Sequence, residues 1–280
     1  MRRVATVRAK FEHDGGMNRV LETAAPRGAA VLSFVCDAQH KKVRPNSGVF
    51  CDTKTMFNRW KKQDEEIEAP PEIRDTLFGD LPLAQWPLES AEWANQEPWS
   101  LFARARNEIV AGNQSAAIQI LQHIAVTPKL ESRHYLQAWH FLREMGVTPE
   151  GTLEKQILGV IVEAGLPGGL DIVAAYADCS ARYFNFSGAA VIWEQPDNSL
   201  DELIRSMLQN GAHIAEQIGP WEDARPPAPT QGQLRINMLT PSGLHFGQGE
   251  MQALIAEPLA RPTFDSALQL MQALIAKTEN

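Results

Sequence analysis

The sequence predicts an α+β fold: an N-terminal helical hairpin plus a bridging helix, then an antiparallel β-meander with a β-hairpin and packed helices. Two observations lead to this prediction. Apolar residues recur with a helical period between residues 98 and 146, whereas short β-rich runs alternate with turn residues from Gln156 onward. The resulting order of helices, strands, helix, strands and helices differs from the strict strand–helix alternation of a nucleotide-binding sheet.

The composition is that of an ordinary globular protein, with 44% hydrophobic and 21% charged residues among 280. A net charge of −8 argues against nucleic acid and anionic membranes as partners, because both require clustered Lys and Arg. Three cysteines cannot make a disulfide framework, and the N-terminal region lacks the pattern of a signal peptide. We therefore expect a cytoplasmic protein.

Four segments differ in composition. Residues 1–55 carry ten Lys/Arg against five Asp/Glu and show little periodicity, so we interpret them as an extension that is either non-native or flexible. Residues 56–97 are an acidic, proline-rich, extended segment with one short helix starting near Pro71. A helical subdomain over residues 98–150 and an α+β subdomain over 151–280 are expected to share one core.

The helical subdomain begins with a hairpin over residues 99–128. Trp99, Ala116 and Pro128 lie near the positions of a tetratricopeptide-type repeat, but no second copy follows, and such arrays need about three units. A third helix, from Glu131 to Met145, is apolar over most of its circumference. It is therefore predicted to be covered on two sides, as a bridge between the hairpin and the strands.

The strands are predicted from the runs "ILGVIVEA", "LDIVAAYA", "ARYFNF" and "AAVIWE", which form the meander, and from "LRINMLT" and "LHFGQ", which form the hairpin. The first run also fits a helical stripe, but its β-branched residues favour a strand. Between meander and hairpin, Ser199 and Glu202 make a capping box that opens a long helix. Its predicted core residues are Leu203, Met207, Leu208 and Ile214.

Few residues suggest metal or cofactor chemistry. Cys36, His40 and Cys51 cluster in sequence, but a structural zinc site needs four ligands and no fourth lies nearby. Cys179 falls at a predicted hairpin tip, and no histidine can be assigned as its base. The glycines around Phe246 do not have the spacing of a phosphate-binding loop. We expect no metal and no cofactor.

A ligand pocket could form between the meander and the C-terminal helices. Strand alternation places Tyr183 and Asn185 opposite Phe184 and Phe186, and a sheet with helices on one face leaves its other face free. The residues expected to build this pocket are Tyr183, Asn185, Arg235, His245 and Asp171.

The strings "PGGLDIVAAYADCSARYFNFSGAAVIWE", "LTPSGLHFGQG" and "ESRHYLQAWHFLRE" resemble a family of uncharacterised bacterial proteins of unknown function. The resemblance covers about residues 70–278 and implies a bacterial origin, but no activity or ligand.

Two functional hypotheses remain open at this point. The first is a non-enzymatic protein-interaction or adaptor module that uses the helical hairpin and the proline-rich loops, with another protein as its partner. The alternative is a small-molecule-binding or hydrolytic module built on the pocket. The absence of a phosphate loop, a Cys/His cluster and an assignable nucleophile from the sequence favours the first.

Overall fold

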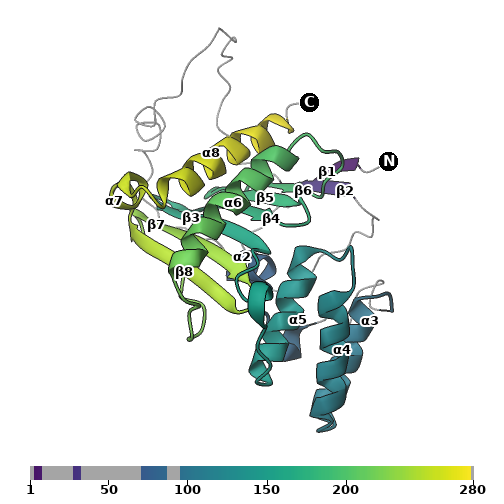
Figure 1. The fold of residues 1–280 in the computed structure, drawn as a ribbon. Coiled ribbons are helices and arrows are strands. Elements are labelled where there is room, and N and C mark those ends of the chain that lie inside the picture. The colour runs from purple at the N-terminus through teal and green to yellow at the C-terminus, as the bar shows by residue number, and fades with distance from the viewer. Residues whose placement is uncertain (1–2, 8–27, 33–70, 87–94, 279–280) are drawn as a thin grey trace, which may run out of the picture.

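The computed structural model describes residues 3–7, 28–32, 71–86 and 95–278, which have a mixed α+β architecture (Figure 1). The helices are α2 (Pro71–Phe78), α3 (Trp99–Val110), α4 (Gln114–Val126), α5 (Ser132–Glu144), α6 (Asp201–Gln217), α7 (Met251–Ala256) and α8 (Arg261–Ala276). The strands are β1 (Arg3–Val7), β2 (Gly28–Leu32), β3 (Gly159–Leu166), β4 (Gly169–Tyr176), β5 (Ala181–Phe184), β6 (Ala190–Trp193), β7 (Gln233–Thr240) and β8 (Gly243–Glu250). The predicted fold class is confirmed.

The described strands form one sheet in the order β1-β2-β6-β5-β4-β3-β7-β8. Strands β3 to β6 make the predicted antiparallel meander, and β7 and β8 make the predicted hairpin. Because β7 pairs with β3, α6 carries the chain from the end of the meander back to its first strand. Strands β1 and β2 come from the predicted N-terminal extension and lie at the edge beyond β6.

One face of the sheet is covered by α6, α7 and α8 (Figure 1). The core between these helices and the sheet is apolar. Alternate residues of the strands point to this side, as a period of two requires. Of the four α6 residues predicted to be in the core, Met207 and Ile214 are buried, whereas Leu203 and Leu208 are only partly buried. The buried residues that meet at the centre of this core are Val160, Val162, Val173, Ile204, Met207, Ile236, Met238, Leu270 and Leu274.

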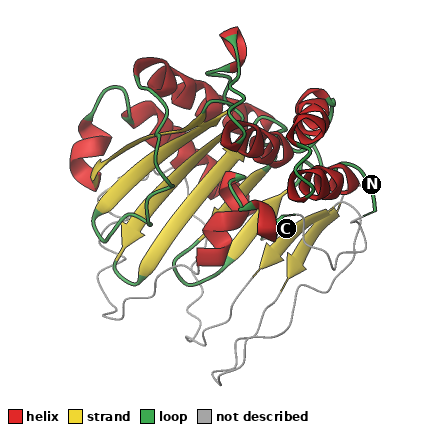
Figure 2. Cartoon of the chain, turned by 90° about the horizontal axis from the view of Figure 1, so that it is seen from below, coloured by secondary structure: helices red, strands yellow, loops and turns green. Residues whose placement is uncertain are grey.

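The opposite face is also covered, so the expectation of a free face is wrong. Leu77 and Phe78 of α2 and Leu136 of α5 pack there against strands β3, β4, β5 and β7. Figure 2 shows the strands side by side with helices packed against them. The position predicted for Phe186 is also wrong. Because β5 ends at Phe184, the alternation does not extend to Phe186, which packs against the core under α6, on the same side as Tyr183.

Helix α5 joins the two parts of the fold, as predicted. Its Leu136 belongs to the core beneath the sheet, whereas Phe141 and Leu142 belong to a separate core with α3 and α4. Helix α2 approaches α5 so closely that a Cβ at Gly79 would lie 2.6 Å from Cβ of Leu136. Gly79 also has a φ of +64°, so glycine both ends α2 and permits this contact.

The predicted capping box at the start of α6 does not form. The helix begins at Asp201 with Leu200 as its N-cap, and no side chain caps it. The N–H of Ser199 instead donates to Oδ1 of Asp197 over 2.8 Å, in a local turn that competes with the cap.

Candidate functional site

The five residues predicted to build a pocket do not converge. Tyr183 on β5 donates its hydroxyl hydrogen to Oδ2 of Asp171 on β4, over 3.1 Å. Asn185 lies in the β5–β6 turn, where its Oδ1 accepts hydrogen bonds from the turn itself. His245 lies on β8, three strands from β4 in the order of the sheet. Arg235 points to the face of the sheet opposite to that of Tyr183. The predicted pocket therefore lacks a common centre.

Asp171 and Tyr183 form a structural pair. The N–H of Phe186 donates to Oδ1 of Asp171 over 2.7 Å, so both carboxyl oxygens are bonded. Burial raises the pKa of Asp171 to about 6, although the two hydrogen bonds oppose the shift. Burial beside this carboxyl also raises the pKa of Tyr183. The pair fastens the chain after β5 to β4.

The face under α2 and α5 contains a buried charged network that the sequence did not reveal. Glu163 of β3 has no exposed surface, and its Oε1 accepts a 2.6 Å hydrogen bond from Nε of Arg74 in α2. Its Oε2 accepts from Nδ2 of Asn237 over 3.1 Å and lies 3.5 Å from Nη1 of Arg235. Two guanidinium groups therefore share one buried carboxylate, with an amide completing its hydrogen bonds.

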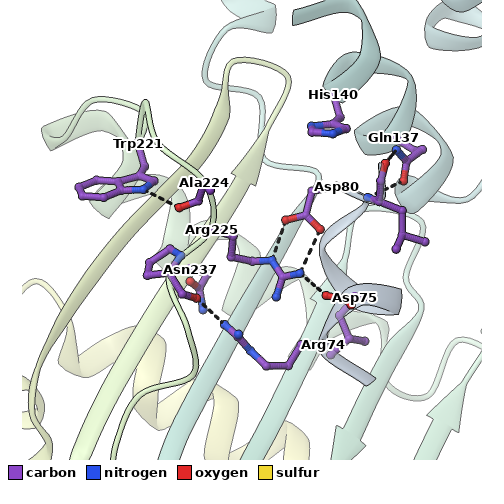
Figure 3. Close-up of polar contacts among 12 residues, drawn as sticks. Arg74, Asp75, Asp80, Gln137, His140, Trp221, Ala224, Arg225 and Asn237 are labelled. Carbon is purple, nitrogen blue, oxygen red and sulfur yellow. Dashed lines mark hydrogen bonds and ion pairs between the residues drawn. The ribbon is translucent and has the colours of Figure 1, made fainter. Parts of the chain in front are cut away.

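The same network holds the proline-rich loop between α6 and β7. The carbonyl of Pro226 accepts hydrogen bonds from Arg74 over 3.2 Å and from Arg235 over 3.4 Å. Arg225 pairs with Asp80 over 2.6 Å and with Asp75 (Figure 3). Its guanidinium also lies 4.5 Å from the ring centroid of Phe78. The loop is thereby fixed to α2 by charges and by a cation–π contact.

The segment that carries Asp80 is fixed in turn by α5. The side-chain amide of Gln137 donates from Nε2 to the carbonyl of Leu81 over 2.8 Å and accepts at Oε1 from the N–H of Leu81 over 3.1 Å (Figure 3). This two-way bond aligns Asp80 with Arg225, so α2, α5 and the loop form one connected unit.

This unit holds an aromatic pair at the outer edge of the sheet. Trp221 of the loop is 44% exposed, and its ring lies 5.2 Å from that of Phe246 on β8, measured between centroids. Nε1 of Trp221 donates to the carbonyl of Ala224 over 3.0 Å (Figure 3), and its main-chain N–H donates to the carbonyl of Leu244 over 2.6 Å. The indole is thus exposed and held in place at the same time.

Strand β8 is the outermost strand on this side of the sheet, so half of its main-chain groups point away from β7. The carbonyl of Leu244 bonds to Trp221, outside the ladder, whereas Met251 donates its N–H to Gly232 on the β7 side. Since the direction alternates along an antiparallel strand, the N–H and C=O groups of Phe246 and Gln248 also point outward. The sequence prediction ended this strand at Gln248, but the pairing continues to Glu250.

No metal site emerges in the part of the chain that the structure describes. Its His, Cys, Asp and Glu side chains nowhere gather in a group of three that could hold an ion. Cys36, His40 and Cys51 lie outside the described residues. Cys179 has a φ of +60° at the β4–β5 turn, and its side chain is buried, which raises the pKa of the thiol. Among the described helices, none has the length and apolarity needed to cross a membrane.

Comparisons with known proteins give no match to a family model, to a curated protein or to a solved structure. The resemblance seen in the sequence therefore stays a prediction.

Proposed function

We propose that the chain is a protein-interaction module that takes up an extended segment of another protein along the outer edge of β8. The observation that carries this proposal is the row of outward-pointing main-chain groups of Phe246 and Gln248, next to the exposed ring of Trp221. A peptide in an extended conformation pairs with such an edge through its own main chain, as an added strand.

Beyond Leu244, whose carbonyl is bonded to the loop at Trp221, strand β8 lacks the usual protection of a sheet edge. Natural edge strands are kept from pairing by lysines, prolines, bulges or short length. The eight residues of β8 contain neither lysine nor proline, and their register with β7 is continuous. Gly247 and Gly249 leave open space where a Cβ would stand, so nothing in the described part of the chain crowds that face of the strand. Within the described residues, the edge at Phe246 and Gln248 therefore lacks the features that keep an incoming strand away.

The network beneath the sheet supports the same function. Tryptophan is enriched among residues that dominate binding energy. A side chain already held in its bound position also loses less entropy when a partner arrives. Trp221 meets both conditions, because the loop that carries it is fixed through Arg225 and Pro226.

The charge around the edge favours a basic partner. Glu222 and Asp223 beside Trp221 are exposed, and so is Glu250 at the end of β8. Arg225 of the same loop and Arg235 of β7 are already bonded to other carboxylates within the buried network. The partner segment is therefore proposed to carry Lys or Arg beside a residue that packs on the indole.

The test compares two substitutions at one position. Gln248→Pro removes an outward N–H without removing a ladder bond to β7, whereas Gln248→Ala removes the same side chain and keeps that N–H. Both variants and wild type are used as bait in cell extract, and captured proteins are quantified by mass spectrometry. We expect a protein that wild type and Gln248→Ala capture equally and that Gln248→Pro loses.

Trp221→Ala should lose the same protein, and added salt should weaken its capture. Circular dichroism of each variant checks that the fold is intact. If Gln248→Pro, correctly folded, captures the same proteins as Gln248→Ala, the edge of β8 is not the binding element.

A further inference from the structure

The turn between β7 and β8 brings a serine and a histidine into contact. Oγ of Ser242 lies 3.2 Å from Nε2 of His245, and Nδ1 of the same ring lies 3.2 Å from the carbonyl oxygen of Ile218. His245 is fully buried, while Ser242 at the tip of the turn is partly exposed. The contact lies at the opposite end of β8 from Gln248 and shares no residue with the proposed binding edge.

The contact with Ile218 determines which nitrogen of His245 carries the proton. A carbonyl oxygen can only accept a hydrogen bond, so a bond between His245 and Ile218 assigns the proton of the neutral ring to Nδ1. The carbonyl of Gly219 also acts on this ring. Nε2 then has a free lone pair, which is directed at Ser242. This is the tautomer in which an imidazole removes a proton from a serine hydroxyl, with the backbone carbonyl in the orienting position that a carboxylate often holds.

A second hydroxyl group leaves the serine proton available to the histidine. Oγ1 of Thr240 lies 2.8 Å from Oγ of Ser242, but it also donates its single hydrogen to the carbonyl of Gly243 over 3.0 Å. When Thr240 donates to Gly243, its oxygen can only accept from Ser242. The hydrogen of Ser242 has two acceptors, Thr240 and Nε2 of His245, of which the imidazole nitrogen is the more basic.

A cation stands beside this turn. Nη1 of Arg143 donates to the carbonyl of Pro241 over 2.7 Å, and its Nε lies 3.7 Å from where a Cβ on Gly243 would stand. Arg143 thus bonds to the residue before Ser242 and lies near the residue after it. Asp80 and Glu144 face Arg143, and Glu154 acts on His245, so the surroundings of the turn carry charges of both signs.

We propose that Ser242 and His245 form a nucleophilic site that acts on small carboxylic esters. Oγ of Ser242 forms a bond to the acyl carbon while its proton passes to Nε2 of His245. The bond from the acyl carbon to the alcohol oxygen breaks, and the alcohol leaves with that proton. Water, deprotonated by the same nitrogen, then releases the carboxylic acid and restores Ser242.

The test uses a fluorescent fluorophosphonate, in which the serine oxygen displaces fluoride from phosphorus. The full chain is incubated with the probe, and the modified residue is located by peptide mass spectrometry. We expect labelling of Ser242, its loss in Ser242→Ala, and a rate at least about 100-fold lower in His245→Gln, which lacks the base. Ser187 is the internal control, because it is exposed but its hydroxyl bonds to Asn185 rather than to a histidine.

Two results would overturn the proposal. The first is an unlabelled Ser242, or a labelling rate that a folded His245→Gln variant leaves unchanged. The second needs no variant: nitrogen NMR of the wild-type imidazole should show Nδ1 protonated and Nε2 not, and the opposite tautomer would rule out the base. Gln248→Pro should leave labelling unaltered, so failure of this proposal is distinguishable from failure of the β8 binding edge.

Discussion

Replacement of Glu163 by glutamine tests whether the buried network fixes the fold. The carboxylate is fully buried, bonded to Arg74 and Asn237 and 3.5 Å from Arg235. Glu163→Gln keeps the shape but removes the negative charge, so two buried guanidinium groups lose their shared counter-charge. Breaking a buried ion pair in this way costs about 3–5 kcal/mol.

The effect is measured by urea unfolding, which gives the free energy, and by thermal unfolding, which gives Tm, each followed by circular dichroism. For a chain of this size each kcal/mol lowers Tm by about 2–4 °C, so the expected fall is roughly 6–20 °C. Glu250→Gln, on the exposed end of β8, is the matched control and should change stability by less than about 0.5 kcal/mol.

A second substitution separates charge from packing. In the Glu163→Gln background, Arg74→Met removes one of the two buried cations that lack a counter-charge. It should recover part of the lost stability, because buried ion pairs are often replaceable by apolar groups. A loss below about 1 kcal/mol for Glu163→Gln alone, or no coupling between the two positions, would refute the view that this carboxylate holds α2 and the loop in place.

Two further predictions concern cooperativity and pH. Because α5 belongs to two cores, the protein should unfold in one calorimetric transition, and a fragment starting at Gly151 should not fold; two separate transitions would contradict this. The second prediction concerns two buried groups whose contributions to stability change with pH in opposite directions. Burial raises the pKa of Asp171 from 3.8 to about 6, so its contribution to stability is present below pH 3.8 and is lost as pH rises to 6, by about 3 kcal/mol. Burial lowers the pKa of His134 from 6.5 to about 4, so its contribution is present above pH 6.5 and is lost as pH falls to 4, by a similar amount. Relative to wild type, Asp171→Asn should therefore make unfolding more sensitive to acid and His134→Phe less sensitive; urea midpoints at pH 4 and 6.5 that move in parallel would show that neither shift exists.

The local elements were predictable because each depends on residues close in sequence. The period of the helix around Phe141 and the β-branched runs around Ile161 determine α5 and β3 directly. The burial of α5 on two sides also followed from its apolar circumference, without knowledge of the sheet.

The candidate site was not predictable, because its bonds join residues far apart in the chain. Arg225 and Asp80 are separated by 145 residues, and Arg74 and Glu163 by 89. In the sequence, Glu163 occupies an alternate position that a half-exposed strand would turn to solvent. Glu163 is buried only because α2 packs on that face of the sheet. The exposed position of Trp221 likewise depends on these distant contacts. The sequence therefore showed only that Trp221 belongs to a proline-rich loop.

The two faces of the sheet differ in what they contribute. The side under α6 and α8 is packed with apolar groups, which supply stability but tolerate substitutions of similar volume. The side under α2 also contains charges, whose removal from water is costly and is compensated only in one arrangement. Such a network adds little net stability, but it restricts α2 and the loop to a single position. A loop that presents Trp221 beside a strand edge requires that restriction, so the charged face and the proposed binding edge depend on each other.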